Sequence, residues 1–309
     1  MMNWLKIIAT LIMLSFFSKA NAQGYCDSTG ASEDADGVIT FSGDEGSIGD
    51  CAFAPDEYTI KIYKMALCTT EPTRPTLTDT YDVSSCVDII NSPGGQDVNL
   101  AAGSEMALSD VSRPADGTYP YGYILMANTF SIKAKKQFTN TMHTYQFGAS
   151  GNYCWTKDAT DYSSEAENWD ESGTTLAECG GAGGTAGTYT EILDHFQPDE
   201  YTVDATPVTG GTLSADLITN ANGLVVDAVQ TADRLFGVQT FTTAVEVTAD
   251  SSLFTVSFGV NQASSLWMSS GGVPSNEYQV YAIGSGPFST FMNVLEKETI
   301  FFLELYMSL

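Results

Sequence analysis

The sequence predicts an all-β protein that folds as an antiparallel β-sandwich, immunoglobulin-like or jelly-roll-like, with few short helices. Three observations support this fold class. Several segments alternate apolar and polar residues and are rich in β-branched and aromatic side chains, which is typical of half-buried strands. Clusters of Gly, Ser, Asn, Asp and Pro separate these segments at short intervals. No long stretch after residue 22 shows a helical period, which disfavours a doubly wound α/β fold.

The first element is an export signal over residues 1–22. Lys6 provides the positive n-region, residues 7–17 form an apolar h-region, and Ala20-Asn21-Ala22 matches an A-x-A cleavage site. The apolar run is shorter than the ~20 residues of a membrane span. We therefore expect cleavage after Ala22, no membrane span in the processed chain, and a secreted, extracellular or cell-surface location. The lack of an N-x-S/T sequon favours a prokaryotic source.

The chain is strongly acidic, with a formal net charge of −26, and loss of Lys6 and Lys19 with the signal makes it two charges more negative. Such a field repels phosphates, so we expect no nucleic-acid partner and no binding to anionic membranes. The basic residues concentrate between Lys61 and Lys157, where residues 133, 135 and 136 form the one lysine cluster. We interpret this cluster as protection of a sheet edge. The alternative is a contact with the acidic face of a neighbouring subunit.

All six cysteines follow the signal, and an exported chain reaches an oxidising compartment, so we expect three disulfides. Six cysteines allow 15 connectivities. Short loops rich in turn residues favour the sequential pairing, which would contribute roughly 3 kcal/mol per loop in the chain-entropy model. The absence of close pairs such as C-x-x-C excludes a zinc site. The expected pairs are Cys26–Cys51, Cys68–Cys86 and Cys154–Cys179.

Seven segments are the best strand candidates. In residues 58–64 the alternation places Tyr58, Ile60 and Ile62 on one face. Residues 119–134 are long enough for one bent strand or two consecutive strands. The other candidates are residues 223–229, 236–248, 253–260, 277–283 and 299–307. Turns are expected at residues 92–95, 115–117 and 269–272, and short helices at residues 163–170 and 190–196.

A glycine-rich stretch, residues 180–187, follows the last cysteine and has the composition of a flexible joint. It divides the exported chain into a disulfide-reinforced β domain, residues 23–187, and a cysteine-free β domain, residues 188–309. The alternative is one large sandwich in which these glycines form an ordinary loop.

Few residues have the signature of catalysis. Only His143 and His195 are of a residue type that could act as a near-neutral proton shuttle, and the nucleophile elbow, H-E-x-x-H, the P-loop and the dinucleotide fingerprint are absent. We therefore predict no catalytic and no cofactor-binding residue, and we expect a protein that is not an enzyme. A glycosidase needs only two suitably spaced carboxylates, which 38 acidic residues could supply from anywhere in the chain.

Two features suggest ligands. Asp34 and Asp36 form a D-x-D-G fragment, as in calcium loops, although the further ligands of an EF-hand are missing. A structural calcium ion is therefore the only cofactor that we consider. Trp155, Trp169 and Trp267 could form a platform for sugars, although the first two also fit core or surface positions.

Two function classes follow. The first is a non-catalytic surface protein, a pilus-like filament subunit or an adhesin, which associates with itself or with another surface protein. Export, acidity, the β pattern and the lack of a catalytic signature support it. The second is a secreted carbohydrate-binding or carbohydrate-hydrolysing protein, with glycans as partners. The sequence does not separate the two classes.

Overall fold

A computed structural model describes most of the chain between residues 31 and 296. The described residues are 31–41, 51–100, 105–106, 112–146, 148–166, 175–196, 199–208, 210–260, 263–286 and 289–296. The export signal with its cleavage site, Cys26, Trp169 and the strand expected at residues 299–307 lie outside the described residues. No helix among the described residues is long and apolar enough to cross a membrane.

The described chain is almost entirely β and has two large sheets, which confirms the all-β part of the prediction. One eight-stranded sheet, the β8 sheet, contains β1 (Ala31–Glu33), β2 (Ile39–Phe41), β3 (Cys51–Phe53), β8 (Lys135–Thr144), β9 (Ser150–Thr156), β11 (Ala177–Gly180), β17 (Ser264–Ser269) and β18 (Glu277–Ser285). A second, the β7 sheet, contains β4 (Glu57–Cys68), β5 (Cys86–Leu100), β7 (Gly117–Lys133), β10 (Ala159–Tyr162), β12 (Tyr189–Ile192), β13 (Thr202–Val208), β14 (Gly211–Ile218) and β15 (Arg234–Val247). A smaller sheet contains β6 (Glu105–Met106), β16 (Ser251–Gly259) and β19 (Ser289–Glu296). The short helix α2 (Ser163–Ala166) matches the start of the helix expected at residues 163–170.

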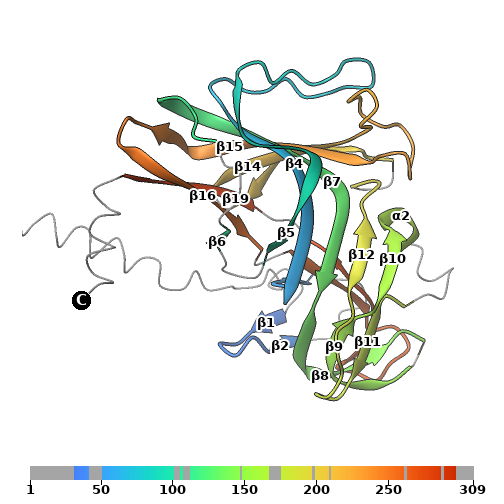
Figure 1. The fold of residues 1–309 in the computed structure, drawn as a ribbon. Helices are drawn as coiled ribbons and strands as arrows, with labels where there is room; N and C mark the ends of the chain where they lie inside the picture. The colour runs from blue at the N-terminus through green and yellow to red at the C-terminus, as the bar shows by residue number, and fades with distance from the viewer. Residues whose placement is uncertain are drawn as a thin grey trace, which may run out of the picture.

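Strand β7 organises the molecule. One of its edges pairs with β4 along most of its length, while the other pairs first with β15 and then with β12. Figure 1 shows β4 and β7 curving together from the layer of β14 and β15 towards β8, β9 and β11. After Ala134 the chain continues directly into β8, so one long segment links the two large sheets. Residues 119–134 are therefore a single bent strand with its last residue at the corner.

The expectation of purely antiparallel sheets is wrong at three places. Strand β18 pairs in parallel with β8, β2 meets β8 in parallel at one position, and β10 pairs in parallel with β12. A parallel pair requires a crossover connection, whose path depends on distant parts of the chain. The alternation within one strand carries no information about the direction of its partner.

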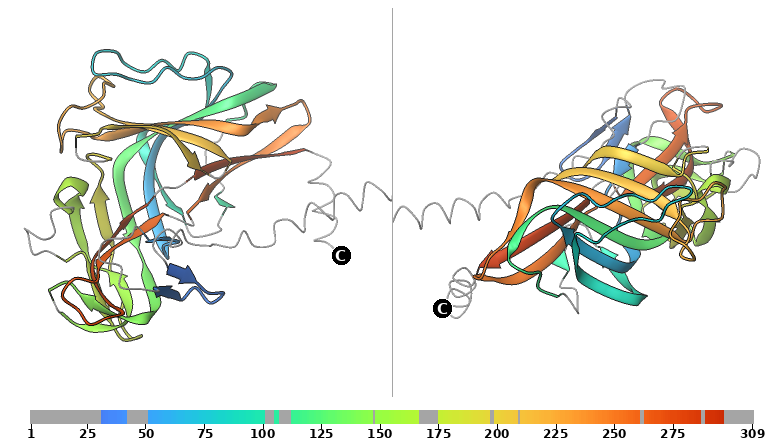
Figure 2. Two further views of the ribbon diagram at one scale, coloured as in Figure 1. Left: turned by 180° about the vertical axis from the view of Figure 1, so that it is seen from behind. Right: turned by 90° about the horizontal axis from the view of Figure 1, so that it is seen from above.

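Buried apolar side chains from both large sheets form one continuous core. Tyr58, Ile60 and Ile62 of β4 are each at most 1% exposed, which confirms the face predicted from their alternation. Phe138 of β8 and Tyr278 of β18 belong to the same cluster. The views in Figure 2 place the smaller sheet of β6, β16 and β19 beside the layer of β14 and β15. In this sheet β19 lies next to β15. Each large sheet takes strands from both sides of residue 187, so the expected domain boundary runs through both sheets.

Two predicted disulfides are present. Cys68–Cys86 joins the ends of β4 and β5, and Cys154–Cys179 joins β9 to β11. Cys51 is also disulfide-bonded, and its expected partner Cys26 lies outside the described residues. No cysteine among the described residues is free.

Three local interpretations are corrected. Residues 223–229 form only an isolated bridge at Val225, because Asn222 Oδ1 accepts the Leu224 N–H and Gly223 adopts φ +67°, which makes a turn. Residues 190–196 are not helical, since β12 covers their start. Residues 92–95 do not turn the chain back but form an irregularity within β5, where Gly95 has φ +75°.

In β8, Lys135 and Lys136 pair with β9 on one side, while β2 and β18 pair with the other side of β8 only from Phe138 onwards. Each lysine has an intramolecular partner. Lys133 pairs with Glu57, and Lys136 Nζ lies 2.6 Å from Glu33 Oε1 in a largely buried ion pair. Lys135 Nζ donates to the carbonyl oxygens of residues 182 and 184.

The contacts of Lys135 and Trp155 show that residues 180–187 form a packed loop. Lys135 Nζ lies 5.8 Å from the centre of the Trp155 ring. A Cβ on Gly184 would lie 2.1 Å from Cη2 of Trp155, and one on Gly187 would lie 2.4 Å from the backbone nitrogen of Asp158. Glycine is required at positions 184 and 187 for close packing.

Gly184→Ala is therefore expected to lower the free energy of unfolding by about 1–3 kcal/mol, because the added methyl group must displace the Trp155 ring. Gly183→Ala is the matched control, since a Cβ there meets nothing within 4 Å. Urea unfolding of both variants measures the difference. Equal stability of the two variants would contradict the packed loop.

Candidate functional site

The two calcium candidates form part of a hydrogen-bonded turn. Asp34 and Asp36 lie between β1 and β2, where Asp34 Oδ1 accepts the backbone N–H groups of Asp36 and Val38 at 2.9 Å. Gly37 completes this turn with φ +79°. No group of three or more His, Cys, Asp or Glu side chains that could hold a metal ion occurs among the described residues. The D-x-D-G pattern is thus accounted for by turn chemistry.

The two histidines lie in different surroundings. His143 of β8 is on the β8 sheet, where its Nε2 lies 2.5 Å from Glu277 Oε2 of the parallel neighbour β18. His195 is 4% exposed and follows β12. His195 also lines a pocket, whereas His143 does not line it, so the surroundings of His195 are described further.

This pocket, about 150 Å³ in volume, lies between β12 of the β7 sheet and β17–β18 of the β8 sheet. Figure 1 shows β12 beside β10 and α2. Alternation along β12 directs Tyr189 and Glu191 to its buried face. The remaining lining residues are Ser163, Leu193, His195, Phe196, Trp267, Ala282, Gly284 and Ser285.

Tyr189 contributes a buried hydroxyl group. The residue is 1% exposed, and its hydroxyl oxygen has no hydrogen-bond partner among the described residues. Burial raises the pKa of Tyr189 well above its ordinary value, and the charges of Glu191 and Asp161 raise it further. The hydroxyl therefore stays protonated at neutral pH and is buried behind the pocket wall. A buried polar group without a partner is costly to the fold, so it calls for an explanation.

Glu191 places a carboxylate in the same wall. Its Oε2 accepts the backbone N–H of Ser285 at 2.6 Å. The neighbouring Gly284 permits this approach, because a Cβ there would lie 3.2 Å from the same oxygen. The carboxylate is thus held between β12 and β18, with its charge close to Tyr189.

His195 is held by Asp194 and Ser163, but not as a catalytic triad. Ser163 Oγ and Asp194 Oδ1 both approach Nδ1 of His195, at 3.3 and 3.1 Å. In a triad the serine and the aspartate contact different ring nitrogens. Ser163 Oγ instead donates to Asp194 Oδ1 at 2.8 Å. The geometry therefore does not activate a serine nucleophile.

Asp194 is a structural anchor behind the pocket. It accepts hydrogen bonds from the backbone N–H and the hydroxyl of Ser164, and from the backbone N–H of Gln230. Burial alone raises the pKa of Asp194, but the hydrogen bonds from Ser164, Ser163 and His195 outweigh burial and lower it. Its ionised carboxylate ties α2 and the loop before β15 to the end of β12.

The chemistry of the pocket suits binding better than hydrolysis. Glycoside hydrolysis requires two carboxyl groups that flank the scissile bond. Among the described residues that line the pocket, Glu191 is the only carboxylate. A carboxylate, a phenol, a histidine and a partly exposed tryptophan are well suited to hold a small polar molecule.

Two of the lining residues were considered in the sequence analysis, although neither was predicted as a site residue, and two were not considered. Trp267 and His195 were candidates, and both line the pocket. Trp155 is elsewhere, packed against the glycine loop. Tyr189 and Glu191 were missed, because the segment that carries them was interpreted as a helix.

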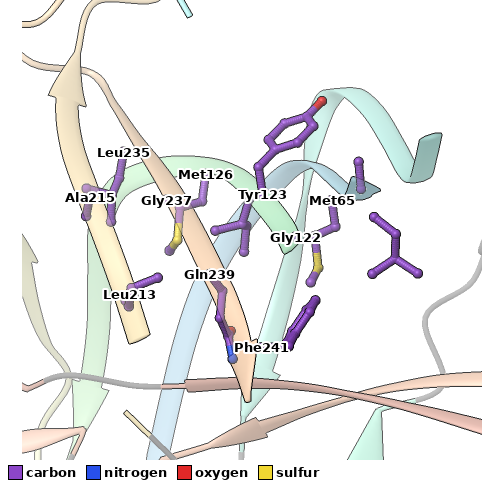
Figure 3. A pocket seen from close by; sticks show the side chains of 13 residues that line it. Met65, Gly122, Tyr123, Met126, Leu213, Ala215, Leu235, Gly237, Gln239 and Phe241 are labelled. Carbon is purple, nitrogen blue, oxygen red and sulfur yellow. The ribbon is translucent and has the colours of Figure 1, made fainter. Parts of the chain in front are cut away.

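A second cavity, of about 50 Å³, is apolar and lies against the β7 sheet. Figure 3 shows Met65, Met126 and Phe241 around it, with Tyr123 pointing away from them. Gly122 and Gly237 have no side chain to fill this space. A Cβ on either residue would lie 3.0 Å from a neighbouring side chain. The cavity is a small packing gap in the core.

Comparison of the chain with protein-family models, with curated proteins and with solved structures found no match.

Proposed function

We propose that this protein is an exported, non-catalytic surface protein of the adhesin class, which recognises a partner through the pocket of Tyr189, Glu191 and Trp267. The observation that carries the proposal is the pocket of about 150 Å³ between β12 and β17–β18, where the Glu191 carboxylate lies close to the partly exposed side chain of Trp267. A pocket with an aromatic wall and a fixed carboxylate is suited to hold a small polar molecule.

Other features support a rigid recognition protein outside the cell. Two disulfides indicate an oxidising environment. The acidic surface disfavours nucleic acids and anionic membranes as partners. We also infer that the two large sheets are layers of one sandwich, because β7 passes directly into β8 and both sheets share one core. Such a scaffold would hold the pocket wall in a fixed geometry.

Two edge strands favour the adhesin over the filament subunit. Filament subunits that polymerise by strand addition need an open sheet edge. Among the described strands, β5, β10 and β13 each have one partner and are edges of the β7 sheet, and two of the three contain a proline. Pro93 and Gly95 interrupt β5, and Pro207 lies within β13. Proline lacks an N–H donor, so such edges resist pairing with another chain.

Two measurements on the purified exported protein test this proposal. A thermal-shift screen against small polar compounds, including neutral sugars, amino acids, polyols and choline, is expected to find at least one that raises the melting temperature. The shift should shrink in Trp267→Ala, which removes an aromatic wall of the pocket. Negative-stain electron microscopy should show separate particles. Ordered polymers, or no compound whose effect depends on Trp267, would contradict the proposal.

A further inference from the structure

Asn222 is the only asparagine in the sequence that is followed by glycine. Glycine has no Cβ to hinder its own backbone nitrogen, so this nitrogen can approach the side-chain amide of the preceding residue. Asn222 is exposed on a turn, residues 219–224, that follows β14, whereas Gly223 is buried. The pair therefore combines a reactive sequence with a side-chain amide that water reaches.

Two hydrogen bonds prepare the Asn222 amide for attack. Its Oδ1 accepts the backbone N–H of Leu224 at 3.0 Å and the Thr219 hydroxyl at 2.5 Å. Donors placed on a carbonyl oxygen stabilise the negative charge that develops there when a nucleophile adds to its carbon. The turn thus presents an amide carbon that is activated at its oxygen.

The same turn holds the nucleophile back. The Gly223 N–H donates to the Thr219 carbonyl oxygen at 2.9 Å. Gly223 is also closely packed, because a Cβ there would lie 2.8 Å from Thr80 Oγ1 and 3.1 Å from Cε1 of Tyr81. Water must reach this N–H before the nitrogen can lose its proton. The reaction therefore requires a local opening of the turn, and its rate follows the fraction of molecules in which the turn is open.

The loop of residues 69–85 keeps the turn closed. Just after the turn, the Val225 N–H donates to the Thr76 carbonyl oxygen at 3.0 Å. Tyr81 stacks on the buried Phe236 of β15, with 4.7 Å between the ring centres. This stack fixes the tyrosine ring against the turn, so opening the turn costs these contacts as well as the hydrogen bonds within it.

We propose that Asn222 is a deamidation site whose rate is set by the contact between Tyr81 and Gly223. In the open turn the Gly223 nitrogen loses its proton to hydroxide and forms a bond to Cγ of Asn222. Nδ2 then takes a proton from water, the Cγ–Nδ2 bond breaks, and ammonia leaves. The resulting five-membered succinimide adds one water molecule at either of its two carbonyl carbons and opens to aspartate or isoaspartate. Overall, one water molecule is consumed and one ammonia is released.

The isoaspartate product would keep the turn open. Its main chain runs through Cγ, so it has one extra backbone atom before Gly223, and the turn no longer places the Gly223 N–H on the Thr219 carbonyl oxygen. Either product also adds a negative charge to a turn that already contacts Asp233, whose Oδ1 accepts the Asn220 N–H at 2.6 Å. Deamidation is thus expected to be a one-way step that releases the turn from the neighbouring loop.

The test follows the conversion of each asparagine by peptide mapping with mass spectrometry, while the purified exported protein is kept at mildly alkaline pH. Asn222 should convert faster than Asn220, which is exposed on the same turn but is followed by alanine. Unfolding in urea should accelerate conversion of Asn222 roughly tenfold or more, because only open turns react in the folded protein. Tyr81→Leu should accelerate it about fivefold to tenfold in the folded protein and leave the rate in urea unchanged.

Tyr121→Leu is the matched control, because Tyr121 is partly buried against the same apolar cluster as Tyr81 but lies on β7. It should convert Asn222 at the wild-type rate. Asn91 of β5 reports on global unfolding, and its conversion should be equally slow in both folded variants. Three results would overturn the inference: conversion of Asn222 no faster than that of Asn220, equal rates at Asn222 in Tyr81→Leu and Tyr121→Leu, or acceleration at Asn91 as large as at Asn222 in folded Tyr81→Leu.

Discussion

Replacing Arg74 by methionine is expected to lower the free energy of unfolding by about 3–5 kcal/mol at pH 7, because it leaves a buried carboxylate without its counter-ion. Arg74 lies in the loop closed by the Cys68–Cys86 disulfide. Its Nε and Nη2 donate to the two carboxylate oxygens of Asp216 on β14, at 2.8 and 2.6 Å. The Asp216 side chain is only 2% exposed, so water cannot replace the guanidinium. Urea unfolding measures the loss.

The loss should depend on pH. Burial raises the pKa of Asp216, while the hydrogen bonds and the charge of Arg74 oppose that rise. Without Arg74 the folded-state pKa rises further above the unfolded value of about 3.9. Between those two values the folded state binds more protons than the unfolded state, so stability falls as pH rises. The deficit of Arg74→Met should therefore be smallest near pH 4 and grow towards pH 7.

The double variant Arg74→Met/Asp216→Asn is the control, because it removes both charges together. Exchanging both partners is far less costly than leaving one charge buried. The double variant should regain more than half of the lost stability at pH 7 and show little of the pH dependence. If it is no more stable than Arg74→Met, the arginine acts instead through its contacts with the carbonyl oxygens of Val203 and Ala215.

Local patterns predicted the strands well where one face is buried throughout. The alternation of residues 58–64 and the length of residues 119–134 led directly to β4 and β7. The pairing partners could not be predicted in this way. The change of partner along β7 and the parallel pairing of β18 with β8 depend on contacts between residues far apart in the chain.

The residues of β12 that line the candidate site could not be predicted from the sequence, for a physical reason. Tyr189, Ile192, Leu193 and Phe196 stand at the spacing i, i+3, i+4, i+7, which is typical of an amphipathic helix. Pairing with β7 and β10 overrides this local pattern and makes residues 189–192 a strand. The strand places Tyr189 and Glu191 on one face, so the pocket could not be recognised while the segment was interpreted as helical.

Asn128→Leu is expected to lower the free energy of unfolding by about 2–4 kcal/mol, because two carbonyl groups lose their donor in a buried environment. Asn128 lies on β7 at the point where the pairing changes from β15 to β12, and it is 3% exposed. Its Nδ2 donates to the carbonyl oxygens of Leu193 and Ala232, at 2.9 and 3.0 Å. This amide joins the end of β12 to the segment before β15, and thus holds the strand that carries the pocket.

Asn140→Leu provides the comparison that isolates the effect of burial. Asn140 Nδ2 also donates to two carbonyl oxygens, those of Phe41 and Asn276, and its Oδ1 accepts the Phe41 N–H, but these contacts are partly exposed. Water can replace the lost donor there, so we expect a loss of about 1 kcal/mol. Thermal and urea unfolding of both variants give the comparison. Equal losses of unfolding free energy would mean that the change of partner along β7, from β15 to β12, does not depend on the buried amide. A larger loss for Asn128→Leu, accompanied by weaker binding in the pocket, would link the change of strand partner directly to the geometry of Tyr189 and Glu191.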